Sequence, residues 1–205
     1  MDTGTYSDLL TRIKALAGVS DFTDNELTFL NSFVNRRANI AYRASEFWPR
    51  YLVVGEPRTV VNNIVPYKQT GMKDIDTFLR IHKTYTPYQL LTAMELEYFV
   101  TNDGAYLVAD TLPSNPTYVT YKTVWEGPYD PTSTNIPYEW FDYLAHSVYS
   151  DFLRQDGQSD KALTEDSFAS DILSEQLSRT DITRSAGMIA HRISTHVSRS
   201  YRSPR

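Results

Sequence analysis

Three pairs of carboxylates are the first candidates for acid–base chemistry in this sequence. The pairs are Asp74 with Asp76, Glu95 with Glu97, and the adjacent Glu165 and Asp166. Residues two apart in a strand point to the same face, so the second pair could stand side by side as the carboxylates of a glycosidase do. Neighbours on a helix diverge, and the last pair therefore cannot converge on one substrate atom. Because a solvated strand face carries the same pattern far more often, the spacing does not favour a catalytic pair.

Histidines, thiols and glycine-rich loops offer no better site. No H-E-x-x-H motif and no carboxylate at ligand spacing accompanies the histidines, so we expect them to be exposed to solvent. They are His82, His146, His191 and His196. The chain has no cysteine, which excludes disulfides, thiolate ligands and a thiol nucleophile, and it has no phosphate-binding loop and no G-x-S-x-G motif. We therefore predict that the protein is not an enzyme and has no catalytic residues, no cofactor and no metal site.

The strongest charge signal lies in the C-terminal segment. Residues 182–205 contain five arginines and neither lysine nor acid. Because the whole chain carries −5 and this segment +5, the remainder carries −10 with neutral histidines. The sequence therefore predicts an acidic body with a basic C-terminal arm. The arm residues expected to make contacts are Arg184, Arg192, Arg199, Tyr201, Arg202 and Arg205.

Three interpretations of this arm stay open. Its arginines could neutralise nucleic-acid phosphates while a tyrosine stacks on a base. They could instead pair with carboxylates of an acidic protein surface, or the arm could be a solvated tail whose serine and glycine content gives it little structure. Apolar residues at helical steps favour docking on a protein, because a segment that only binds phosphates would not need them. These residues are Met188, Ile189, Ile193 and Val197.

The elements that would position these residues begin with two predicted helices. Apolar residues recur at helical spacing over 6–17, and Gly18 favours the left-handed conformation that ends a helix. Thr23 and Glu26 form a T-x-x-E capping box at the start of a second, longer helix. Its narrow stripe of small and large residues continues to the Phe47-Trp48 pair, and Pro49 ends it.

The middle of the chain has the composition of strands. Asp103-Gly104 supplies the turn of a hairpin between strands at 96–100 and 105–109. The other predicted strands are 51–54, 58–67, 78–83 and 118–125. Helical patterns return at Pro137 with a broad apolar face, and a last helix is expected over about 159–181.

This order predicts an α+β fold in which four antiparallel helices form a bundle, with a small antiparallel β module inserted and an extended basic arm. The bundle is expected from 1–49 and 132–181, the β module from 50–131, and the arm from 182–205. No apolar run approaches the roughly 20 residues that span a bilayer, and the N-terminal residues lack the basic region of a signal peptide.

The aromatic content suits a protein that buries surface against partners. The chain has 15 tyrosines, 9 phenylalanines and 3 tryptophans. Tyrosine combines a large rigid contact area with a polar tip, as interfaces require, although a tyrosine-rich sheet without any partner would have the same composition. We expect Phe47, Trp48, Trp140 and Phe141 to be anchors in the core or in a subunit interface.

The pattern resembles bacteriophage head-to-tail adaptor proteins, which include the tail tubular A protein of short-tailed phages. The resemblance covers roughly residues 6–181. It rests on the helix that carries Asn35-Arg36-Arg37-Ala38-Asn39-Ile40-Ala41-Tyr42 and closes on Phe47-Trp48-Pro49, followed by the β module. The returning helix opens on Ile136-Pro137-Tyr138-Glu139-Trp140-Phe141. The arm is longer and more arginine-based than this family pattern.

The resemblance implies a structural subunit of a ring, usually twelvefold, that joins the portal to the tail in the virion neck after assembly in the host bacterial cytoplasm. The expected partners are further copies of the chain, the portal protein, a tail or nozzle protein, and genomic DNA that passes without sequence-specific binding, but no membrane. An acidic channel would repel the DNA phosphates and allow the DNA to pass, while the basic arms bind the portal. Two other classes stay open: a phage tail accessory whose β module recognises a receptor or glycan, and a nucleic-acid-binding or enzymatic protein.

Overall fold

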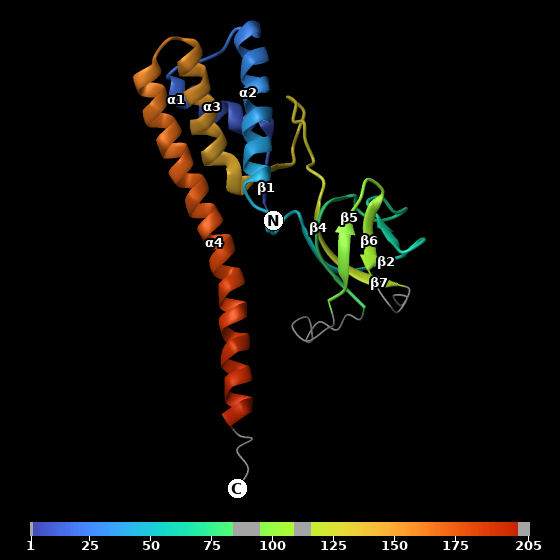
Figure 1. Cartoon of the computed structure of the whole chain (residues 1–205). Helices are drawn as coiled ribbons and strands as arrows, with labels where there is room; N and C mark the ends of the chain where they lie inside the picture. The colour runs from blue at the N-terminus through green and yellow to red at the C-terminus, as the bar shows by residue number, and fades with distance from the viewer. Residues whose placement is uncertain (1, 84–94, 109–115, 201–205) are drawn as a thin grey trace. The chain divides into compact units, whose positions relative to one another are not determined.

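The computed structural model describes the backbone of residues 2–83, 95–108 and 116–200, and the side chains of these residues up to Arg179. The chain divides into two compact units (Figure 1). The helical unit comprises residues 1–45 and 126–183, and the β unit comprises residues 46–125 together with 184–205.

Local sequence signals set the ends of the first two helices. Helix α1 (Tyr6–Ala17) begins at a capping box in which Thr5 and Asp8 bond each other's backbone, and Gly18 ends it in the left-handed conformation. Helix α2 (Asp24–Arg43) has a second capping box, between Thr23 and Glu26, as the sequence predicts. The first helix and the start of the second are thus confirmed.

The end of α2 differs from the prediction. The helix stops at Arg43, with Ala44 as its C-cap, and does not continue to the Trp48-Pro49 corner. Trp48 instead starts a turn, because its carbonyl accepts bonds from the backbone N–H groups of Tyr51 and Leu52. Trp48 lies beyond the end of the helix, in the stretch assigned to the β unit, and is 2% exposed, so the apolar stripe ends in a buried residue outside α2.

The rest of the helical unit packs around α3 (Phe141–Gln155), which contacts both α1 and α2. A short 3₁₀ turn, η1 (Tyr138–Trp140), precedes it, so the α-helix begins four residues later than predicted. Helix α4 (Ser159–Ser200) follows directly after Gly157, and its first turns pack on α3. Strands β1 (Thr3–Gly4) and β8 (Ile136–Pro137) form a small antiparallel pair beside them. None of the described helices is both long and apolar enough to cross a membrane.

The β unit contains two three-stranded antiparallel sheets. The first has the order β2-β7-β4 and is built from β2 (Leu52–Arg58), β7 (Thr117–Thr123) and β4 (Ile75–His82). The second has the order β3-β6-β5 and is built from β3 (Ile64–Pro66), β6 (Gly104–Val108) and β5 (Glu97–Val100). Buried residues of both sheets form one apolar core, which includes Phe78, Ile81, Leu107 and Val119.

The predicted fold class is wrong. Within the described residues the protein is an α+β structure with four α-helices and three small antiparallel sheets made of eight strands. This is more β-structure than a helical bundle with a small β module. The strands β1 and β8 are only two residues long and have no alternating pattern, so the sequence does not predict them. The middle of the chain also has its own two-sheet core, which a small insertion would lack.

The predicted arm is also not extended over most of its length. The backbone remains helical to Ser200, because no proline and only Gly187 interrupts the chain between Ser159 and that residue. The serine content of this segment suggested little structure, but its apolar residues at helical steps indicated the helix correctly.

Candidate functional site

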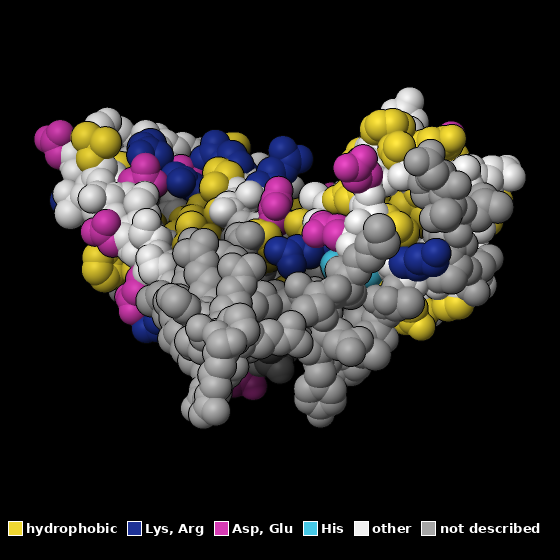
Figure 2. Space-filling view, turned by 60° about the horizontal axis from the view of Figure 1, so that its bottom comes forward, with side chains coloured by type: hydrophobic (Ala, Val, Ile, Leu, Met, Phe, Trp, Pro, Cys, Tyr) yellow, Lys and Arg dark blue, Asp and Glu magenta, His cyan; other side chains and the backbone are white. Residues whose placement is uncertain are grey.

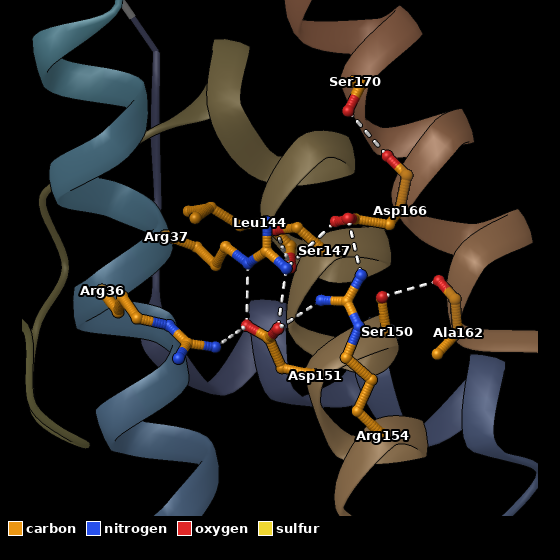
Figure 3. Close-up of polar contacts among 10 residues, drawn as sticks. All are labelled: Arg36, Arg37, Leu144, Ser147, Ser150, Asp151, Arg154, Ala162, Asp166 and Ser170. Atoms are coloured by element: carbon orange, nitrogen blue, oxygen red, sulfur yellow. Dashed lines mark hydrogen bonds and ion pairs between the residues drawn. The ribbon is translucent and has the colours of Figure 1, made fainter. Parts of the chain in front are cut away.

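The most strongly connected polar group of the helical unit is a cluster of charged side chains where α2, α3 and α4 meet (Figure 3). We call it the arginine–aspartate cluster; it consists of Arg36, Arg37, Asp151, Arg154 and Asp166. The carboxylate of Asp151 on α3 lies at its centre and is only 2% exposed. Helices α2 and α4 lie on either side of α3 in this view.

Asp151 is held mainly by the guanidinium of Arg37. The Nε and Nη2 atoms of Arg37 donate to the two carboxylate oxygens, each at 2.7 Å. This two-pronged geometry is the strongest form of ion pair between side chains. Arg37 also reaches Asp166 on α4 at 3.0 Å, so one guanidinium, whose side chain is 13% exposed, joins three helices.

Two more exposed arginines complete the cluster. Arg36 pairs with Asp151 at 2.6 Å from the α2 side, and its own side chain is 56% exposed. Arg154, one turn along α3, bridges Asp151 at 3.2 Å and Asp166 at 2.7 Å. Each carboxylate therefore has at least two cationic partners, and the burial of charge is compensated.

The electrostatics of the cluster favour its ionised form. Burial alone would raise the pKa of Asp151, but the hydrogen bonds from Arg37 and Arg36 and their positive charges outweigh it and leave the pKa below its ordinary value. The hydrogen bond to Asp151 raises the pKa of Arg37 in turn. The Asp151 carboxylate, held by hydrogen bonds from Arg37 and an ion pair with Arg36, is thus suited to clamp α2 to α3.

The lowered pKa of Asp151 predicts an acid dependence of stability. The contribution of Asp151 should be complete above the pKa of an unfolded aspartate, about 3.9, and should be lost as the pH falls through the lower pKa of the folded state. Urea unfolding from pH 5 to pH 2 should show a smaller loss of unfolding free energy in Asp151→Asn than in the wild type. Parallel curves for the two proteins would contradict this assignment.

The β unit has a buried charge of its own, at Arg58. This side chain is fully buried and donates to Glu56 at 2.9 Å, to the hydroxyl of Tyr121 at 2.6 Å and to the carbonyl of Lys73 at 2.5 Å. Burial and the hydrogen bond with Glu56 raise the pKa of Tyr121 to about 12, although Arg58 acts in the opposite direction. Its partners lie on β2, β7 and the segment before β4, so this group ties the sheet together.

The outward face of α2 has an unusual composition. Residues at steps of four and three, opposite the buried stripe, form what we call the outer α2 stripe: Phe29, Phe33, Arg36, Ile40 and Arg43. Phe29 is 46% exposed and Ile40 is 45% exposed. The guanidinium of Arg36 lies 5.3 Å from the centre of the Phe33 ring. Large apolar side chains and arginines thus share one exposed face.

The outward face of α4 has the opposite character. Exposed residues at helical spacing form the outer α4 face: Asp160, Thr164, Ser167, Asp171 and Glu175. The face is acidic and has small side chains along its middle, while Leu163 and Phe168 are exposed at its margins. In Figure 2 acidic, basic and hydrophobic side chains lie interspersed on the visible face of the molecule.

The residues predicted as anchors occupy different environments. Trp48, Trp140 and Phe141 are buried, and Phe47 is half-buried. Their proposed role in a subunit interface stays a prediction. The side chains of Arg184, Arg192 and Arg199 lie outside the described residues, as do Tyr201, Arg202 and Arg205 altogether.

The expected exposure of the histidines is wrong for two of them. His82 is 2% exposed on β4, and His146 is half-buried, with Nδ1 2.7 Å from the carboxylate of Glu165. The side chains of His191 and His196 lie outside the described residues. Glu95 and Glu97 are both exposed. Among the described side chains, no group of three or more His, Asp or Glu residues could hold a metal ion.

Sequence reasoning missed the arginine–aspartate cluster and Arg58. Asp151 follows Leu144 and Val148 at helical steps, which places its carboxylate on the apolar face of the helix. Because charged residues are rarely buried without a partner, this position could have indicated a buried ion pair. No protein-family model matches the chain, and no curated protein matches it at a significant level.

Proposed function

We propose that the protein is a structural adaptor subunit of a ring in a bacteriophage neck, where it joins the portal to the tail and continues the DNA channel. In this proposal the chain has no catalytic role. Copies associate side by side, the C-terminal segment binds the portal, and the β unit meets a tail or nozzle protein.

The observation that carries the proposal is the complementarity of two different faces of one helical unit. A closed ring needs a heterologous interface, in which one face of a subunit fits another face of its neighbour. The outer α2 stripe offers Phe29 and Ile40 with arginines, and the outer α4 face offers small side chains with Asp171 and Glu175. Exposed large apolar side chains beside opposite charges are typical of surfaces that become buried on association.

The arginine–aspartate cluster supports the same proposal. A ring that withstands DNA passage needs rigid subunits, and the cluster fixes α2 and α4 to α3, so both outer faces keep a set separation. The net charge of −10 over residues 1–181 would repel DNA phosphates from the channel wall. The five arginines of 182–205 would pair with an acidic portal rim.

Electron microscopy of the purified protein, alone and with the portal protein, tests the proposal. We expect closed rings that stack on the portal. Replacing the five arginines of 182–205 by glutamine should leave the rings intact and weaken portal binding by at least roughly tenfold, because charge-assisted hydrogen bonds are lost. Replacing the five serines of the same segment by alanine is the matched control. Monomers that never bind a portal would refute the adaptor role, and unchanged binding of the glutamine variant would refute the role of the arm.

A further inference from the structure

Strand β5 leaves one row of its backbone groups facing away from its sheet. The Thr101 N–H donates to the Gly104 carbonyl at 2.8 Å and closes the β5–β6 hairpin. With that register, Phe99 and Glu97 exchange backbone hydrogen bonds with β6, since they pair with Tyr106 and Val108. The intervening residues Tyr98 and Val100 direct their N–H and C=O groups to the other side.

The neighbouring sheet uses this side of β5 only at its start. The Leu96 N–H donates to the Ile81 carbonyl at 2.8 Å, which joins the residue before β5 to β4. Within the described residues, no backbone hydrogen bond links β4 to Tyr98 or Val100, and the ladder of β4 is irregular between Phe78 and Arg80. The hydroxyl of Tyr98 donates to the Phe78 carbonyl at 3.2 Å. The Tyr98 side chain thus connects β5 to β4, whereas, in the part of the chain that the structure describes, the backbone groups of Tyr98 and Val100 make no bond to β4.

The surface along this edge is apolar and acidic. Phe99 is 58% exposed and Val100 is 60% exposed, and the Phe99 ring stacks on the Tyr106 ring at 5.9 Å. An open groove of about 560 Å³ follows the strand and is lined by Glu95, Leu96, Glu97, Tyr98, Phe99 and Val108. Residues 95–108 contain three carboxylates and no basic side chain.

We propose that β5 is a docking edge for an extended peptide segment of a partner protein, in which basic and apolar residues alternate. The segment adds as a fourth strand to the sheet β3-β6-β5, with main-chain hydrogen bonds to Tyr98 and Val100. Its side chains alternate between the two faces of the sheet, so its basic side chains lie on the face of Glu95, Glu97 and Phe99, and its apolar side chains lie on the face of Tyr98 and Val100. Open, exposed strand edges are the usual site of such strand addition, and the local charge selects a cationic partner. This proposal does not depend on the ring.

The opposite edge of the sheet is less suited to this role. In β3 the Ile64 N–H already donates to the Val61 carbonyl at 2.9 Å, and Pro66 has no N–H group. Proline and occupied donors block strand addition. The difference between the two edges therefore favours strand addition at β5 over strand addition at β3.

Ten-residue peptides that alternate lysine or arginine with valine or phenylalanine are the probe. Titration followed by amide hydrogen exchange should show binding and at least tenfold slower exchange at Tyr98 and Val100. Peptides with glutamate in place of the basic residues should bind at least tenfold more weakly. Absence of binding, or binding that leaves these two amides unprotected, would overturn the proposal, as would preferential binding of glycans at this edge.

A pair of variants at one position separates the backbone role from side-chain effects. Val100→Pro removes the outward N–H without removing a hydrogen bond to β6, and should weaken peptide binding at least tenfold with the fold retained. Val100→Thr keeps the N–H and the β-branched shape, and should bind as the wild type does. Equal binding by both variants, with unchanged circular dichroism, would show that the edge is not used.

Discussion

Replacing Asp151 by alanine should lower the free energy of unfolding by about 3–5 kcal/mol, the usual cost of removing one partner from a buried ion pair. The side chain of Arg37 is 13% exposed and would lose both hydrogen bonds that it makes to this carboxylate. Arg36 and Arg154 would lose a partner at the same time, so positive charge would remain uncompensated between three helices. Urea unfolding monitored by circular dichroism measures the effect.

Arg36→Ala is the matched control for this prediction. It removes an arginine from the same carboxylate, but the side chain is 56% exposed and Arg37 remains in place. Solvent screens such a pair, and the expected loss is below about 1 kcal/mol. Equal losses in the two variants would mean that the cluster does not depend on the buried pair. A loss for Asp151→Ala below that of the control would contradict its central position.

The elements that the sequence predicts well are those with local signals. Thr23 and Glu26 are three residues apart, and their mutual capping depends on nothing distant. Gly104 ends the predicted turn with a positive φ of 148°, where a side chain would meet the backbone of Val65. Helix starts and hairpin turns therefore follow from short stretches of sequence.

The candidate site depends on distant residues and was largely beyond sequence reasoning. Arg37 and Asp151 are 114 positions apart, and either one alone is typical of a solvated helix face. Their pairing exists only because α2 and α3 pack together. The outer α2 stripe, in contrast, could have been predicted from the helical spacing of Phe29, Phe33 and Ile40.

The break at Trp48 shows how a correct pattern can be assigned to the wrong element. Helical spacing from Ala41 through Ser45 to Trp48 predicted one long helix, but α2 ends at Arg43 and Trp48 is buried outside it. A large aromatic residue satisfies the hydrophobic pattern wherever it is buried. Periodicity therefore identifies buried residues better than it identifies the end of the helix.

Replacing Ile40 by aspartate should abolish ring formation without unfolding the protein. Ile40 is 45% exposed in the outer α2 stripe, so a charge there costs little in the free subunit. In the proposed interface the same charge would be buried against the acidic outer α4 face of the next copy, and the repulsion would recur at every interface of the ring. Mass photometry should find monomers, with the melting temperature of the wild-type monomer nearly retained.

Val19→Asp is the control, because Val19 is 41% exposed in the same unit but lies outside both faces. A charge exchange then tests the pairing itself. Arg43→Glu should weaken the ring, as should Glu175→Arg, whereas the double variant should recover assembly because opposite charges face each other again. Rings that survive Ile40→Asp, or a double variant no better than either single change, would place the subunit contact elsewhere on the molecule.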